Sequence, residues 1–199
     1  QAAPGIESLE HGHSAVSLYL GLKRSPEELG IHGENCWVNE TLDQQDIDAQ
    51  TAAVIAGKPC RCYISFPSMR GGSVRRHTAE IIAIVTNDPF RRWEGQSWQE
   101  RDTQYRALKE RIGEGLLSLA DRHIPGLRAL VDYQEVSTPL TMAHFGGRPA
   151  GSMYGFKPDA QRFGGLWFDA RTRLKGLYLS GSDVCMMGVA GGLMGGVAC

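Results

Sequence analysis

The last part of the chain constrains the fold most, because a single acid there joins an apolar segment to a glycine-rich run. Residues 177–179 read Leu-Tyr-Leu and predict a short buried strand. A turn follows over residues 180–183, with Asp183 as its only acid. Residues 188–196 then predict a glycine-rich helix. This order of strand, turn and helix is typical of a nucleotide or cofactor site.

Each part of this segment has a chemical use at such a site. Gly181 leaves room where a side chain would block a ligand, and Asp183 can accept hydrogen bonds from sugar-type hydroxyls. A helix beginning at residues 188–192 presents unpaired N–H groups and the positive end of its dipole. A flavin matches these features, since its ribityl chain carries hydroxyls and its N1/C2=O edge becomes anionic on reduction. The alternative is a segment that only packs tightly on its neighbours, because a lone glycine-rich turn is a weak signal.

The composition is ordinary for a globular protein. The 199 residues, 42% hydrophobic and 22% charged, suffice for one domain, or for one domain and part of another. A formal net charge of −1 offers nucleic acid no basic surface, so no such partner is expected. Five scattered cysteines, an odd number, do not form a disulfide framework, and we expect a reducing, cytoplasmic location. No secretory signal opens the sequence, and Lys175 and Asp183 interrupt the C-terminal apolar run, which argues against a membrane span.

Two short motifs carry residue types that bind metals, but neither has the spacing of a metal site. His11-Gly12-His13 has no acid at a suitable distance along the chain, and we expect a surface loop. Cys60-Arg61-Cys62 lies in an alternating segment, where both thiols point toward the core. No metal is therefore predicted.

Hydrophobic periodicity predicts an α+β fold with a mixed, largely antiparallel sheet. Strands are expected at residues 15–22, 36–38, 60–66, 78–85 and 130–137, with 15–22 half-buried, 78–85 central, and 60–66 and 78–85 an antiparallel pair. Helices are expected at residues 46–56, 99–123 and 138–145. Gly113 and Gly115 weaken the longest helix, which predicts close packing against another backbone there.

Several motifs resemble one family in the order in which they occur. Residues 176–183 followed by 188–191 resemble the C-terminal flavin motif of the FAD-dependent carotenoid and retinoid oxidoreductases. Those enzymes include phytoene desaturases, carotenoid isomerases and retinol saturase, and Gly181-Ser182-Asp183 is most similar to the last two. Further matches lie at residues 17–23, 63–68, 77–82, 138–141 and 151–155. The resemblance covers most of the chain.

The resemblance implies a division of the chain and a set of site residues. Residues 1–170 would be part of a substrate-binding domain, and residues 171–199 the last strand, turn and helix of a Rossmann-like FAD domain. The family's N-terminal Gly-x-Gly-x-x-Gly loop is absent, so we expect a piece of a longer enzyme that binds FAD poorly alone. Tyr154 and Arg148 are candidate substrate contacts. The FAD contacts would be Gly181, Ser182, Asp183, Gly188, Val189, Ala190 and Gly191.

The implied reaction is hydride or electron exchange between FAD and a conjugated polyene, which would be saturated, desaturated or isomerised. Two alternatives stay open, an isomerase without net redox change and an apolar-ligand-binding module without activity. The apolar faces of residues 16–22 and 60–66 suit a tunnel for such a substrate, unless they pack on the helix at 99–123. Arg148 and Arg162 are candidate anchors for a polar substrate end or an FAD phosphate. His77 and Glu80 lie near the flavin or serve packing.

The expected partners follow from the same resemblance. The substrate is an apolar polyene, and peripheral membrane contact of the whole enzyme is compatible with it. Exposed apolar residues at 177–179 and in the helix from residue 188 predict that the chain associates with itself.

Overall fold

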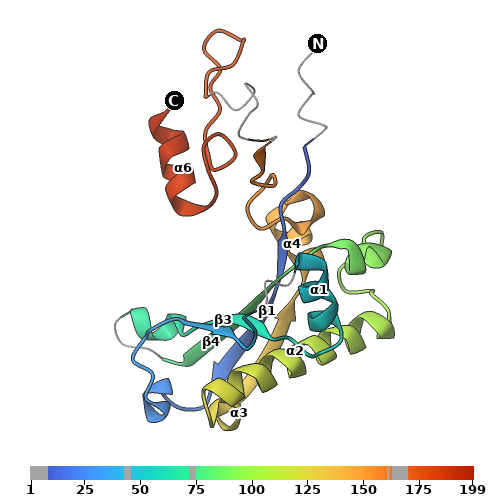
Figure 1. Cartoon of the computed structure of the whole chain (residues 1–199), viewed down its shortest axis with the longest axis vertical. Helices are drawn as coiled ribbons and strands as arrows, with labels where there is room; N and C mark the ends of the chain where they lie inside the picture. The colour runs from blue at the N-terminus through green and yellow to red at the C-terminus, as the bar shows by residue number, and fades with distance from the viewer. Residues whose placement is uncertain (1–8, 43–45, 72–74, 161, 163–169) are drawn as a thin grey trace.

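The computed structural model describes residues 9–42, 46–71, 75–160, 162 and 170–199. Five strands form one open sheet in the order β2-β3-β4-β1-β5 (Figure 1). Every pairing among these strands is antiparallel, so the expected α+β fold with a largely antiparallel sheet is confirmed. The strands are β1 Ser14–Leu22, β2 Cys36–Asn39, β3 Arg61–Ser65, β4 His77–Val85 and β5 Val131–Ser137.

Helices connect the strands, and the longest of them runs along one face of the sheet (Figure 1). The α-helices are α1 Ile47–Ile55, α2 Thr103–His123, α3 Leu127–Leu130, α4 Pro139–Gly146 and α6 Gly188–Val197. Four short 3₁₀ helices, η2 Pro26–Leu29, η3 Pro67–Arg70, η4 Asp88–Trp93 and η5 Pro149–Gly151, complete the connections. The sequence predicted α1, α2, α4 and the helix after residue 188, but not α3 or the 3₁₀ helices.

The start of α2 corrects one predicted boundary. The expected helix began at residue 99, whereas α2 begins at Thr103. Asp102 has an extended backbone, and its carboxylate accepts the Tyr105 N–H at 2.8 Å, which makes it the N-cap. A cap of this kind ends the preceding loop and begins the helix, so residues 99–102 lie outside it. Thr138 is the N-cap of α4 and forms a reciprocal capping box with Thr141.

The core lies between α2 and one face of the sheet. Leu18 of β1 and Ile64 of β3 both pair with Ile81 of β4, so these three fully buried side chains share a face. They form one hydrophobic cluster with Ile112 and Leu116 of α2. The apolar faces of residues 16–22 and 60–66 therefore pack on α2. They do not line a substrate tunnel, and the stated alternative is confirmed.

β1 is more buried than its alternating sequence predicted. β4 pairs with it on one side and β5 on the other, and even Ser14 and Ser17 are buried. The alternation of apolar and polar residues predicted a half-buried strand. Because β1 lies between two neighbouring strands, its polar face also loses exposure to solvent. β4 is central, as expected.

The glycines of α2 mark a close approach to another backbone. A Cβ built on Gly115 would lie 2.5 Å from the carbonyl oxygen of Gly57, just after α1. A Cβ on Gly113 would lie 2.9 Å from Cγ2 of Val136 in β5. The predicted packing against a backbone is confirmed at Gly115, and Gly113 meets a side chain instead.

The C-terminal segment differs from its prediction in one respect. Residues 177–179 form no strand, and only an isolated bridge joins Arg171 to Tyr178. The side chains of Leu177, Tyr178 and Leu179 are exposed because no strand among the described residues lies beside them. The glycine-rich helix after residue 188 is confirmed as α6, which lies apart from the sheet (Figure 1).

Within the described part of the chain, no helix is both long and apolar enough to cross a membrane.

Candidate functional site

A buried arginine holds the predicted cofactor motif in place. Arg162 is 1% exposed and donates from Nη1 to the carbonyl oxygen of Phe156 at 2.7 Å. Its Nη2 donates to the carbonyl oxygen of Ser182 at 2.8 Å and lies 3.7 Å from Oδ1 of Asp183. The same Oδ1 accepts the Phe156 N–H at 3.1 Å. Arg162 therefore binds the backbone of the motif itself and positions Asp183. The sequence had offered Arg162 only as a ligand anchor.

Gly155 makes room for the acid of the motif. Its φ of +78° is in the left-handed region, and a Cβ there would overlap the carboxylate of Asp183. The Asp183 side chain nonetheless keeps 38% of its exposure. A ligand hydroxyl can therefore still reach this carboxylate.

The start of α6 presents unpaired N–H groups. Met187 is the N-cap residue and provides no side-chain hydrogen bond, and the first turn contains no acid. Gly188 has a φ of +78°, and a Cβ there would meet nothing within 4 Å. The N-terminus of α6 is thus open to an acceptor from outside the chain.

Two further glycines pack α6 onto the motif. A Cβ on Gly191 would overlap the carbonyl oxygen of Met186, and one on Gly195 would overlap that of Gly181. The structure thereby brings the predicted cofactor residues together in one place. They are Gly181, Ser182, Asp183, Gly188, Val189, Ala190 and Gly191.

The second face of the sheet carries a wide apolar groove. Trp37 pairs with Tyr63, and Tyr63 with Ile82, so these side chains share the face opposite to α2. The Trp37 and Tyr63 rings lie 4.8 Å apart. We call this surface the aromatic groove, with a volume of about 890 Å³. Apolar and aromatic residues that line it include Trp37, Tyr63, Ile82, Ile84, Met153 and Tyr154, and the polar lining residues are Asn35, Asn39, Gln50 and Arg61.

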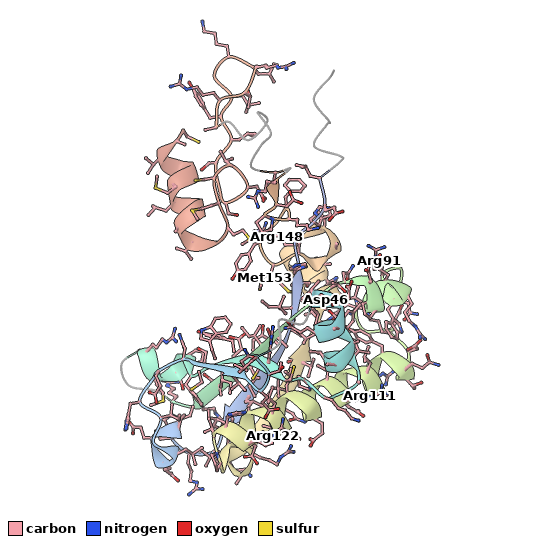
Figure 2. The ribbon with its side chains drawn as sticks, in the orientation of Figure 1. Asp46, Arg91, Arg111, Arg122, Arg148 and Met153 are labelled. Atoms are coloured by element: carbon pink, nitrogen blue, oxygen red, sulfur yellow. The ribbon has the colours of Figure 1, made fainter. Side chains whose placement is uncertain are left out.

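The two predicted substrate residues line different cavities. Tyr154 lines the aromatic groove, and Arg148 lines a separate cleft of about 720 Å³ between η4 and α4. Arg148 and Met153 both lie between the sheet and α6 in the view of Figure 2. The sequence missed Trp37 and Tyr63, although both alternate with the apolar residues that it placed on the other face.

An acid of β4 lies on the same face as the groove. Burial raises the pKa of Glu80 above its ordinary range, and a hydrogen bond from Ser17 partly opposes this effect. Tyr19 of β1 is its cross-strand partner. His77, the first residue of β4, has a buried Nδ1 without a hydrogen-bond partner among the described residues.

The chain holds no evident metal site in its described ranges, where no three His, Cys, Asp or Glu side chains gather. His11 instead stacks on Phe156, with ring centroids 5.6 Å apart.

Comparison with known proteins gives several relatives, although no protein-family model matches the chain. An all-trans-retinol 13,14-reductase of Danio rerio is 26% identical over 100% of this chain and 35% of its own length. An inactive all-trans-retinol 13,14-reductase of the same fish is 27% identical over 98% of this chain and 34% of its own length. A chloroplastic prolycopene isomerase of an Oncidium hybrid is 31% identical over 69% of this chain and 23% of its own length. The chain thus spans about a third of the curated retinol reductases that it matches.

Proposed function

Because the chain is homologous to retinol reductases and prolycopene isomerases, the carotenoid and retinoid oxidoreductases that its motifs resemble, we propose that it belongs to a flavin-dependent polyene-modifying enzyme. In this proposal the enzyme saturates, desaturates or isomerises a double bond of a conjugated retinoid or carotenoid. The observation that carries it is the match to a retinol reductase over 100% of the chain. Since that match spans 35% of the relative, the proposal concerns the whole enzyme, of which these residues form a part.

The proposed cofactor is FAD, bound at residues 181–191. When bound, it supplies the hydride and electron chemistry. Asp183 would accept hydrogen bonds from the hydroxyl groups of the ribityl chain of FAD. The N–H groups that begin α6 would stabilise the N1/C2=O edge of the flavin, which becomes anionic on reduction. The exposure of Asp183 and the open space at Gly188 fit this assignment. Within the proposal, residues 171–199 are the last segment of the FAD domain and residues 1–170 belong to the substrate domain.

The proposed substrate surface is the aromatic groove. A polyene is a long, flat, apolar chain, and its burial against aromatic rings removes apolar area from water. Trp37 is 78% exposed and Tyr154 42%, so both rings have surface left for a ligand. The groove thus replaces the α2 face as the proposed wall of the substrate site, with Tyr154 as the contact that the sequence predicted.

Two alternatives follow from particular relatives. The prolycopene isomerase match favours an enzyme that changes double-bond geometry without net redox change. The match to a retinol reductase named inactive favours an apolar-ligand-binding module. Product mass separates the first alternative from reduction or desaturation, because only a redox reaction changes the number of hydrogen atoms in the polyene.

The test is the visible absorption spectrum of the full-length protein that contains these residues, purified as wild type, Asp183→Ala and Asp132→Ala. Asp132 is an exposed acid of β5 and serves as the matched control. We expect bound-flavin bands in the wild type and the control, and their loss in Asp183→Ala. A folded, colourless wild type that cannot be loaded with FAD would exclude the flavoenzyme and favour the binding module.

A further inference from the structure

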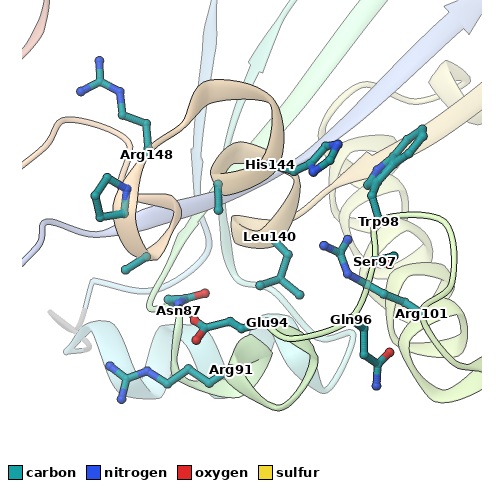
Figure 3. A pocket seen from close by; sticks show the side chains of 13 residues that line it. Asn87, Arg91, Glu94, Gln96, Ser97, Trp98, Arg101, Leu140, His144 and Arg148 are labelled. Carbon is teal, nitrogen blue, oxygen red and sulfur yellow. Dashed lines mark hydrogen bonds between the residues drawn. The ribbon is translucent and has the colours of Figure 1, made fainter.

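We propose that the cleft between η4 and α4, which we call the Arg101 cleft, binds a small anion of the phosphate or carboxylate class. Its volume is about 720 Å³. It shares no lining residue with the aromatic groove, and it contains none of the proposed FAD contacts. The residues that carry the argument are Asn87, Arg91, Gln96, Arg101, His144 and Arg148 (Figure 3).

The centre of the argument is a buried positive charge without a counter-ion. Arg101 is 6% exposed, and no carboxylate among the described residues lies within ion-pair distance of it. Its Nε has no hydrogen-bond partner in that set, and its Nη1 has only the Tyr105 hydroxyl, at 3.4 Å. Removing a cation from water without pairing it is unfavourable, and a bound anion would offset that cost.

The position of Arg101 keeps it available to a ligand. Its guanidinium group lies over the Tyr105 ring, 5.0 Å from the centroid. Tyr105 is itself fixed, because its hydroxyl shares a 2.7 Å hydrogen bond with Thr138. Both sequence neighbours of Arg101 are acids, but neither Glu100 nor Asp102 forms an ion pair with it. Asp102 is already occupied by the Tyr105 N–H and by Nε1 of Trp93. Figure 3 shows the guanidinium end of Arg101 directed toward Leu140, into the cleft.

Two other unpartnered polar atoms line the same cleft. The side-chain oxygens of Asn87 and Gln96 are buried and accept no hydrogen bond from the described residues. Buried polar atoms without partners are rare in folded proteins, and three of them at one cavity indicate a ligand with complementary groups. A buried donor on Arg101 and two buried acceptors that line the same cleft match an anion that also carries a hydroxyl, such as a hydrogen phosphate or a phosphate monoester.

The rim adds positive charge and a flat surface. Among the described residues, the Arg148 side chain forms no ion pair or hydrogen bond, and Arg91 pairs only with the exposed Asp88. The rim acid Glu94 accepts the Asn87 amide at 2.6 Å. The rings of Trp98 and His144 stack with centroids 5.8 Å apart along the wall. Cations therefore outnumber acids at this cleft, although the whole chain has a net charge of −1.

The test is binding of inorganic phosphate, and separately of acetate, to the 199-residue chain at fixed ionic strength, with chloride as the reference anion. Calorimetry and thermal unfolding give the affinity and the stabilisation. We expect phosphate or acetate to raise the unfolding temperature more than chloride does. Arg148→Gln should weaken binding about tenfold, because it removes a charged hydrogen-bond donor from the rim. Arg24→Gln removes an equal charge at an exposed ion pair far along the chain and should leave binding unchanged.

Arg101→Met distinguishes a ligand-binding arginine from a structural one. Methionine keeps the length and apolar contacts of the side chain and removes the unpaired charge. We expect this variant to unfold at a higher temperature than wild type in anion-free buffer and to lose the stabilisation by phosphate. The proposal is overturned if neither anion binds better than chloride, or if Arg148→Gln and Arg24→Gln bind alike. Should Arg101→Met fail to fold, Arg101 is structural and the binding assignment fails with it.

Discussion

The guanidinium group of Arg162 donates a 2.8 Å hydrogen bond to the backbone carbonyl of Ser182, from a side chain that is almost completely buried. This contact joins Arg162 to the proposed flavin motif across 20 positions of sequence. Because the same group also binds the carbonyl oxygen of Phe156, one side chain sets the distance between the two segments. The position of Asp183, and with it the proposed cofactor site, therefore depends on a residue that lies outside the motif.

Arg162→Met should loosen the motif without unfolding the core. It leaves the carbonyl oxygens of Phe156 and Ser182 without donors, at a cost of about 1–3 kcal/mol for each group that stays buried. Hydrogen exchange should accelerate at residues 180–187 and stay unchanged in β1. Arg173→Met, at an exposed position, is the control. Equal exchange in the two variants would show that Arg162 does not hold the motif.

The sequence predicted the strands and the main helices because their periodicity is local. It could not tell which face α2 covers, since β3 and β4 carry apolar residues on both faces, Ile64 and Ile81 on one and Tyr63 and Ile82 on the other. The pairing that decides this is long-range. For the same reason the motif residues at 181–191 were visible in sequence, whereas Arg162 was not identified as their support. Nothing local distinguishes Arg101, whose burial comes from the packing of η4, α2 and α4.

Gly115→Ala tests the contact between α2 and Gly57. Alanine favours a helix by about 1 kcal/mol, but its Cβ would lie 2.5 Å from a backbone oxygen, and overpacking costs about 1–3 kcal/mol. A backbone cannot swing aside as a side chain can, so we expect lower stability in urea unfolding. Gly113→Ala, whose Cβ would meet only side chains, those of Val136 and Leu18, should cost less.

Gly95→Ala is the control for this series, because its Cβ would meet nothing within 4 Å. Its free energy of unfolding should stay within about 0.5 kcal/mol of wild type. A Gly115→Ala protein as stable as Gly95→Ala would mean that α1 and α2 can separate at no cost.

Glu80→Gln should stabilise the protein at neutral pH. The pKa of Glu80 is raised mainly by burial, so the folded state holds the proton more tightly than the unfolded state. The stability that this proton gives is complete below the ordinary glutamate pKa and is lost as pH rises through the raised pKa. The unfolding temperature of Glu80→Gln should exceed that of wild type at pH 7, and the difference should shrink toward pH 4.

Glu110→Gln, at an exposed acid of α2, is the control. Its difference in unfolding temperature from wild type should not grow between pH 4 and pH 7 as that of Glu80→Gln does. A constant difference between Glu80→Gln and wild type from pH 4 to pH 7 would mean that the carboxyl of Glu80 is not penalised by burial.

Self-association should occur through α6. Val189, Leu193 and Val197 are spaced by four residues and are 92%, 69% and 72% exposed, so they form one apolar stripe. Leu193→Gln should shift the chain toward monomer in light scattering at tens of micromolar. Leu42→Gln, at a leucine that is 100% exposed elsewhere, should not. A wild type that is monomeric at this concentration would contradict the prediction.

The place of β1 in the sheet also bears on how the chain folds. β1 precedes both of its partners along the chain, which are β4, where Ser14 faces Val85, and β5, where Ser17 faces Ser137. On the ribosome it must therefore wait for two distant segments, and contacts of such long sequence separation slow folding. Until residue 137 has emerged, one edge of β1 offers unpaired backbone groups to any other strand. In the interval before β5 arrives, this exposed edge makes the nascent sheet prone to pair with other strands.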